Sequence, residues 1–181
     1  MKILEFAQIV GKLKRLKRTG WVKRKIPDPE SVAEHSFRVA VLAMVLADKI
    51  GVDKDKVTKM ALIHDLGEAI IGDIITYQGR KYLPILQEKK RKEMQAIKEI
   101  FSLIDGHEYV RLFEEYEEMK TKESQFVKQI DRLEFAIQTL EYEKQHKIKF
   151  PKEYSEWVNT MIKYNELRKI VNEIENLRNK K

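Results

Sequence analysis

Histidine and acidic side chains occur inside a segment of the chain that is otherwise apolar. His64 and Asp65 are adjacent and have alanine, leucine and isoleucine as neighbours, and Glu68 follows on the same side of a helix. Charged groups are costly to bury in such surroundings unless they are paired or bound to a metal ion. The pair therefore indicates either a hydrogen-bonded core position or a metal site.

Two residues of the same chemical types lie elsewhere in the chain. His35 falls one turn into an expected helix, and Asp131 lies at the edge of the apolar stripe of a later one. If these helices pack against the helix that carries His64 and Asp65, two imidazoles and two carboxylates converge. Such nitrogen and oxygen ligands suit a divalent ion, namely Mn²⁺, Co²⁺, Ni²⁺, Zn²⁺ or Mg²⁺.

The elements that must position these residues have the pattern of helices. Apolar residues recur with a period of 3.6 and almost never with a period of two, which predicts an all-α fold, a compact helical array in a single domain over residues 1–181. Ser31-Val-Ala-Glu34 has the pattern of a capping box and predicts a helix that ends at Ile50, before Gly51. Further helices are predicted over residues 3–16, from Asp53 through the His64–Glu68 region to near Gly72, over 85–103, 107–120 and 123–146, and as one or two amphipathic helices over 152–179, with a loop over 18–30 and an irregular connection over 74–84.

The composition excludes several classes of protein. The 181 residues include no cysteine, which excludes a disulfide scaffold, a thiol nucleophile and cysteine-based zinc or iron–sulfur sites. An apolar fraction of 43% with seven glycines and four prolines argues against disorder. No apolar run is long enough to span a bilayer and the N-terminus lacks a secretory pattern, so we expect a cytoplasmic protein without a membrane partner.

Positive charge is concentrated at the N-terminus. The formal charge is +7, but residues 1–27 carry nine basic side chains and one acidic one, which leaves −1 for the other 154 residues. The predicted helix and loop over residues 1–30 are therefore basic and include Trp21. Such a segment attracts an anionic partner, either a small phosphate ester or a nucleic acid.

Six short stretches together resemble the HD-domain 5′-deoxynucleotidases, a family of metal phosphohydrolases. They are Lys17-Arg-Thr-Gly-Trp21, Pro29-Glu-Ser-Val-Ala-Glu-His35, Ala61-Leu-Ile-His-Asp65, Ile71-Gly-Asp-Ile74, Phe126-Val-Lys-Gln-Ile-Asp131 and Glu141-Tyr-Glu143. The resemblance runs over nearly the whole chain. It implies the HD-domain fold and the hydrolysis of deoxynucleoside 5′-monophosphates to a deoxynucleoside and phosphate.

The resemblance also implies roles for individual residues. One divalent ion would be held by His35, His64, Asp65 and Asp131. Glu68 would be the catalytic carboxylate, which orients or deprotonates the attacking water or protonates the leaving sugar oxygen. The implied substrate contacts are Trp21, Asp73, Thr76, Asp65 and Asp131, and a second metal ion would use Glu68, Asp73 and the carbonyl of Ile74.

The residue before Trp21 departs from the bacterial members of the family. Those enzymes have an arginine there, whose implied role is to orient the phosphate, whereas this chain has Gly20. Arg18, Lys23 or Arg24 could replace it. Trp21 itself either lies beside the nucleotide sugar or anchors its loop on the core.

Other functions stay open at the level of sequence. The same site could act on a ribonucleotide, a cyclic nucleotide or an alarmone. Alternatively, the protein could be a nucleic-acid-binding or adaptor protein with a structural metal, although the even spread of charge beyond residue 27 does not favour that reading. The expected partner is therefore a small nucleotide, and the C-terminal amphipathic helices, like the resemblance, indicate a homodimer.

Overall fold

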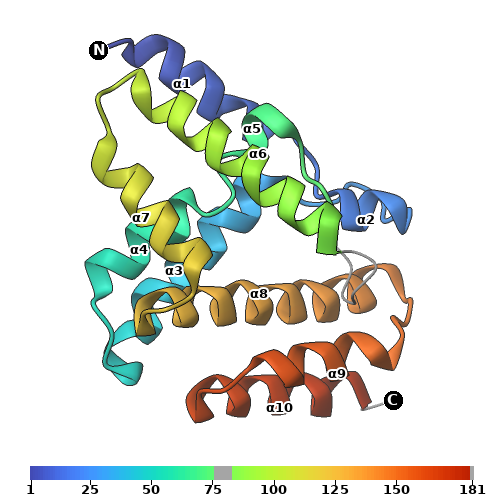
Figure 1. Ribbon diagram of the computed structural model, residues 1–181. Coiled ribbons are helices and arrows are strands. Elements are labelled where there is room, and N and C mark those ends of the chain that lie inside the picture. Colours follow the sequence, from blue (N-terminus) through green and yellow to red (C-terminus); the bar gives the residue numbers. More distant parts are fainter. Residues whose placement is uncertain (76–82, 180–181) are drawn as a thin grey trace.

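Helices form the regular structure of residues 1–75 and 83–179, which are the residues that the computed structural model describes (Figure 1). Within these ranges no β-strand occurs, and a single isolated bridge joins Lys17 to Ser31. This arrangement confirms the predicted all-α fold class. The helices are α1 (Ile3–Gly11), α2 (Thr19–Lys23), α3 (Val32–Ile50), α4 (Lys54–Ile63), α5 (Glu68–Ile71), α6 (Leu83–Ser102), α7 (His107–Glu118), α8 (Lys122–His146), α9 (Lys152–Met161) and α10 (Asn165–Asn179).

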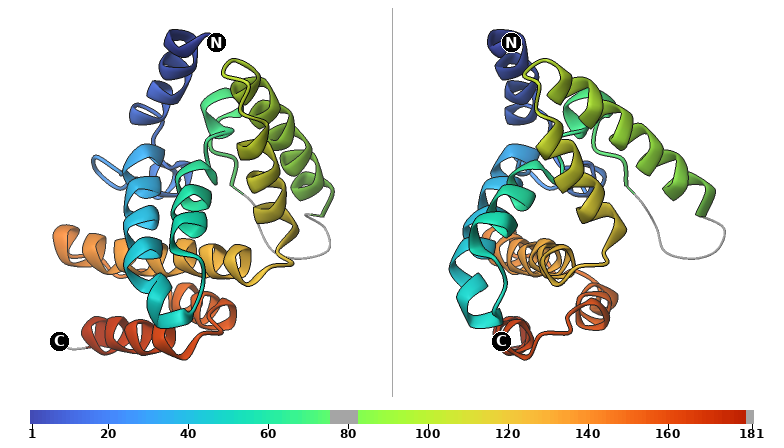
Figure 2. Two further views of the ribbon diagram at one scale, coloured as in Figure 1. Left: turned by 90° about the vertical axis from the view of Figure 1, so that its left-hand side faces the viewer. Right: turned by 60° about the vertical axis from the view of Figure 1, so that its left-hand side comes forward.

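The long helix α8 passes through the middle of the molecule, and other helices pack on its sides (Figure 1, Figure 2). The neighbours α3 and α4 contact it on one side, while α9 and α10 cover another. Helix α7 contacts both α8 and α6. Fully buried Val39, Met60, Ile97 and Phe126 bring four of these helices into one hydrophobic core, which holds α3, α4 and α8 in fixed relative positions.

The start of α3 has the capping box that its sequence predicts. The Glu34 amide donates to Ser31 Oγ at 3.2 Å, and the Ser31 amide donates to Glu34 Oε2 at 2.6 Å. These bonds satisfy two amides that would otherwise lack partners at a helix end. The helix ends at Ile50 and is followed by Gly51, whose φ of 77° is the left-handed conformation that glycine adopts readily. The position of His35, one turn after the cap, follows from this start.

The N-terminal helix is shorter than its apolar pattern predicts. Instead of reaching residue 16, α1 ends at Gly11 and a 3₁₀ turn over Lys12–Lys14 follows. The amide of Val32 donates to the carbonyl of Leu16 at 2.8 Å, which draws this part of the chain along the start of α3 and out of a helical path. The loop predicted over residues 18–30 is also corrected, because it contains the short helix α2.

The helix predicted to run from Asp53 toward Gly72 is broken before its end. Helix α4 ends at Ile63, a turn covers residues 64–67, and α5 follows. A Cβ atom on Gly67 would lie 3.2 Å from the carbonyl oxygen of Glu93, so a side chain here would crowd the backbone of α6 where it passes this turn. The break places His64 and Asp65 in a turn at the end of α4 instead of within a continuous helix.

Most of the connection predicted over residues 74–84 lies outside the described residues. At its far end α6 begins at Leu83, two residues before the predicted start. Residues 152–179 contain two helices, α9 and α10, which were predicted as one or two. Among the described residues, no helix is both long enough and apolar enough to cross a membrane.

Candidate metal centre and substrate cavity

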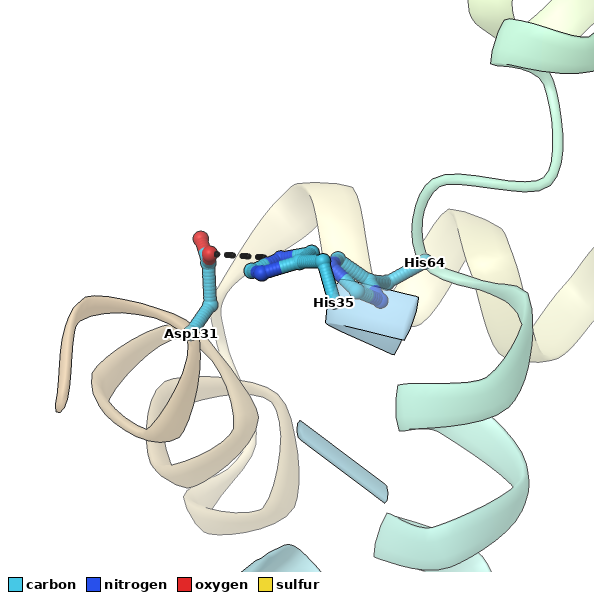
Figure 3. Close-up of side chains that lie close together, drawn as sticks. All are labelled: His35, His64 and Asp131. Atoms are coloured by element: carbon cyan, nitrogen blue, oxygen red, sulfur yellow. Dashed lines mark ion pairs between the residues drawn. The ribbon is translucent and has the colours of Figure 1, made fainter. Parts of the chain in front are cut away.

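Polar side chains from three helices converge beside the core (Figure 3). His35 comes from α3, His64 follows α4 and Asp131 comes from α8, and their ligand atoms lie within 4.8 Å of one another. Asp65 completes the group, because its Oδ2 lies 3.2 Å from His64 Nε2 and 3.7 Å from His35 Nε2. The structure thus brings together the four residues that the family resemblance implied as metal ligands.

Both imidazoles are oriented through their other ring nitrogen. His35 Nδ1 lies 2.6 Å from Glu134 Oε2, and His64 Nδ1 lies 2.7 Å from the carbonyl oxygen of Ala61. Such bonds are the usual way in which a metal-binding histidine is held with its free nitrogen toward the ion. Both Nε2 atoms are buried and have no hydrogen-bond partner within the described ranges. Two orphaned nitrogens beside carboxylates fit a divalent cation.

The charges around the cluster also favour a cation. Burial and Arg18 lower the pKa of His35, but Glu134 and Asp131 outweigh them and raise this pKa to about 10. Burial opposes ionisation of Asp131 as well, yet Arg132 and His35 hold its pKa well below the usual range. The position between these side chains therefore attracts positive charge, whether a proton or a metal ion.

Glu134 supports the cluster, although the sequence pattern did not single it out. It is fully buried, and Arg38 donates to its Oε1 from Nε at 2.9 Å and from Nη2 at 2.6 Å. Burial alone would raise the pKa of Glu134, but His35 and Arg38 keep it below the usual value. The signal in the sequence was its place three residues after Asp131, on the same helix face.

A cavity of about 490 Å³ opens from the cluster between α2, α5, α6, α7, α8 and α9. This volume lies within the range of small-molecule pockets. Its wall includes His64, Asp65 and Asp131, and six cations lie among the acidic groups of the wall, so an anionic ligand near the cluster has positive charge beside it. These cations are Arg18, Arg24, Lys89, Lys90, Lys128 and Arg132.

Glu68 lies in the cavity wall and is only 2% exposed. Lys89 Nζ lies 3.6 Å from Glu68 Oε1, whereas the buried Oε2 has no hydrogen-bond partner in the described part of the chain. Burial, followed by the negative charges of Asp65 and Asp73, raises the pKa of Glu68 well above its usual value in spite of Lys89. Its surroundings therefore favour the protonated form of Glu68 at the wall of the cavity.

Trp21 lines the cavity but is mainly a packing residue. Only 2% of it is exposed, and its ring stacks on Phe135 with 5.1 Å between centroids. Its Nε1 donates to Glu30 Oε1 at 2.9 Å. Of the two roles that the sequence left open, these contacts correspond to that of a loop anchor. They leave little of the ring exposed for contact with a sugar.

The other predicted substrate contacts follow α5. Asp73 lines the cavity, and its Oδ2 accepts a bond of 2.6 Å from the Thr19 amide, which ties α2 to this side of the site. Ile74 also lines the cavity. Thr76 lies outside the described residues.

One of the three cations proposed to replace the missing arginine reaches the cluster. Arg18 Nη1 lies 3.1 Å from Asp65 Oδ2, and Asp65 is 47 residues away in the sequence. Arg24 lines the cavity, but Lys23 is not among the lining residues. The geometry thus singles out Arg18, which the sequence alone could not do.

The fold and the cluster define a class, that of all-helical proteins with a histidine–aspartate cluster that fits a metal ion. Residues 10–175 match the family model described as the HD domain, and the chain belongs to this family. It is 43% identical to the 5′-deoxynucleotidase HDDC2 of Homo sapiens, over 78% of this chain and 68% of that protein.

Two solved structures are similar along nearly their whole length. A conserved hypothetical protein from Pyrococcus furiosus is 37% identical, with a TM-score of 0.78 over 96% of this chain and 99% of that one. A predicted metal-dependent phosphohydrolase from Magnetospirillum magnetotacticum MS-1 is 26% identical, with a TM-score of 0.71 over 97% of this chain and 95% of that one.

Proposed function

We propose that the protein is a metal-dependent 5′-deoxynucleotidase, which hydrolyses deoxynucleoside 5′-monophosphates to a deoxynucleoside and phosphate. One observation carries the proposal: the buried Nε2 atoms of His35 and His64, which have no hydrogen-bond partner among the described residues, face two carboxylates at the wall of a cavity that also carries cations. The name of the human relative, 43% identical, supports the choice of substrate.

The ligands of the ion would be His35, His64, Asp65 and Asp131. When bound, a divalent ion withdraws charge from phosphate oxygens and activates water for attack. Nitrogen and oxygen donors suit Mn²⁺, Co²⁺, Mg²⁺, Ni²⁺ and Zn²⁺. As an alternative to the proton-donor role of Glu68 described next, a second ion would use its ionised carboxylate together with Asp73 and the carbonyl of Ile74. All three residues lie in the cavity wall.

The side chains of the cavity would bind the phosphate and move a proton. Arg18 and Lys89 are placed to balance the charge of the phosphoryl oxygens. Water attacks the phosphorus, the bond from phosphorus to the 5′-oxygen breaks, and Glu68 gives its proton to that oxygen. The raised pKa of Glu68 favours this role of general acid over that of base.

Location and assembly are further parts of the proposal. We expect the protein to act in the cytoplasm as a homodimer, with its C-terminal amphipathic helices as the first candidates for the contact between subunits. Sedimentation velocity on the full chain measures the assembly: a mass of twice 21.5 kDa is expected, and a monomer at micromolar concentration contradicts it.

Phosphate release from a panel of substrates tests the activity. The panel contains the four deoxynucleoside 5′-monophosphates, their ribonucleotides, a cyclic nucleotide and an alarmone, each with Mn²⁺ or Co²⁺. We expect release from the deoxynucleotides, and a kcat lowered at least about a hundredfold by Glu68→Gln, which removes the proton donor.

Glu99→Gln is the matched control, because Glu99 is exposed on α6 and does not line the cavity. Its kcat should equal that of the wild type, and metal analysis should find the ion of the histidine cluster in both variants. Absence of phosphate release from every deoxynucleotide by metal-loaded protein would contradict the proposal. A preference for the ribonucleotides, the cyclic nucleotide or the alarmone would overturn the choice of substrate.

A further inference from the structure

We propose that one wall of the cavity, formed by α8 and α9, binds the nucleobase of the substrate by stacking. This wall, called the aromatic wall below, consists of Phe135, Tyr154 and Trp157. The inference rests on the proposed function, because it assigns a place to the part of a nucleotide that phosphoryl transfer does not need. The reacting end of the cavity requires only charged and metal-binding groups, so three aromatic rings need another explanation.

The aromatic wall begins one helical turn from the metal cluster. Phe135 follows Asp131 by four residues on α8, a rise of about 6 Å along the helix axis. Phe135 contacts Trp157 edge to face with 5.5 Å between ring centroids, and Tyr154 at 5.7 Å. A nucleotide whose phosphate lies at the cluster can therefore extend its base along this wall.

Two arginines continue the stacking surface. Arg132 Cζ lies 4.5 Å from the centre of the Trp157 ring, and Arg24 Cζ lies 4.8 Å from that of Tyr154. Arg132 Nη1 is also 3.2 Å from Asp131 Oδ2, so this side chain links the cluster to the wall. Aromatic rings and guanidinium planes are the groups on which proteins stack unpaired bases.

Helix α9 presents the aromatic side chains in addition to the residues that fix it to the core. Val158 and Ile162 are each 1% exposed and attach the helix to the hydrophobic core. Tyr154 and Trp157 lie on the adjacent face, are only half-buried and line the cavity. Trp157 also packs against the core, and Tyr154 stacks on Phe150 with 5.5 Å between ring centroids. These contacts fix both rings in the cavity wall, where a flat ligand can reach them.

Nuclear magnetic resonance on the whole protein with Mg²⁺ tests the contact directly. Trp21 and Trp157 are the two tryptophans of the chain, so two indole N–H signals are expected, and Trp157→Phe assigns them. Deoxyadenosine 5′-monophosphate should shift the Trp157 signal. The probe 2-deoxyribose 5-phosphate, which has the same sugar and phosphate but no base, should not. Equal shifts with both compounds, or none with either, would overturn the proposal.

Kinetics with the same pair of compounds separates a binding role from a structural one. Trp157→Leu should raise the KM for deoxynucleotides about tenfold and leave kcat unchanged, because stacking on the base is lost. The KM for 2-deoxyribose 5-phosphate should stay within about twofold. Trp157→Phe should recover most of the loss, and Glu156→Ala, exposed on the same helix, should change nothing. An equal rise in KM for both substrates would contradict the proposal.

Failure of this inference can be told apart from failure of the proposed function. Phosphate release from deoxynucleotides without a base-dependent shift of the Trp157 signal would reject the base site and keep the nucleotidase. A base-dependent shift without phosphate release from any deoxynucleotide would reject the nucleotidase and keep the base site.

Discussion

The metal cluster and the aromatic wall of the cavity are held in place by different forces. His35 and Glu134 are fully buried, and directional bonds fix each of them to a neighbour on another helix. Tyr154 and Trp157 are half-buried and are held mainly by ring contacts and by arginines over their faces. Directional bonds suit the reacting end of the cavity, where small displacements matter, and packing suits an end that binds a flat group.

The largest effect is expected from Glu134, the carboxylate that orients His35 in the metal cluster. Glu134→Gln weakens the bond to His35 Nδ1 and should lower the affinity for Mn²⁺ about 10- to 100-fold, the usual cost of losing such a supporting group. Titration calorimetry measures this affinity. The matched control is Glu141→Gln, because Glu141 also pairs with Arg38, at 2.7 Å, but its side chain is 49% exposed. Equal losses in the two variants would show that the bond to His35 has no special role.

A smaller effect is expected from Glu30, which links Trp21 to Arg38. Burial and then Glu134 raise the pKa of Glu30 to about 7, so the folded protein keeps a proton that the unfolded chain loses above about pH 4.5. The free energy of unfolding therefore falls as the pH rises from about 4.5 to 7. Above that range this group causes no further change with pH.

Glu30→Gln should remove this pH dependence, because the amide oxygen can still accept from Trp21 Nε1 and does not titrate. Urea unfolding at pH 5 and pH 7.5 measures the free energy of unfolding. Relative to the wild type, that of the variant should rise by about 2 kcal/mol from the lower pH to the higher. A constant difference between variant and wild type at the two pH values would contradict the assignment.

The smallest effect is expected from Trp21→Phe, which tests what anchors the basic loop. The variant keeps an aromatic ring against Phe135 but loses the bond to Glu30, so the free energy of unfolding should fall by about 1 kcal/mol. The KM for deoxynucleotides should hardly change, because the ring is almost completely buried. A large rise in KM with unchanged stability would instead support Trp21 as a wall beside the sugar.

Local features of the fold were predictable from the sequence, and long-range ones were not. The capping box at Ser31 and the 3.6-residue period predict α3 and α8 because each depends on residues within a few turns. The break before Glu68 depends on the contact of Gly67 with Glu93, and the pair of Arg18 with Asp65 joins positions 47 residues apart. Neither contact leaves a local pattern.

The site divides in the same way. The four expected ligands were recognisable because they lie in short stretches typical of a family. The aromatic wall was not recognisable from the sequence, because it forms only when α9 packs beside α8. The period of an amphipathic helix shows which face is buried but does not identify the helix that covers this face. The role of Glu134 was only partly predictable. The sequence shows its spacing of three residues from Asp131, but it does not show that His35 approaches it from another helix.

The most direct test of the metal centre is to locate a divalent ion in a crystal. An anomalous difference map from a crystal soaked in Mn²⁺, recorded at the manganese edge, should show a peak within bonding distance of His35 Nε2 and His64 Nε2, with Asp65 and Asp131 completing the ligands. No peak at this cluster at saturating Mn²⁺, or a peak only elsewhere in the molecule, would contradict the assignment.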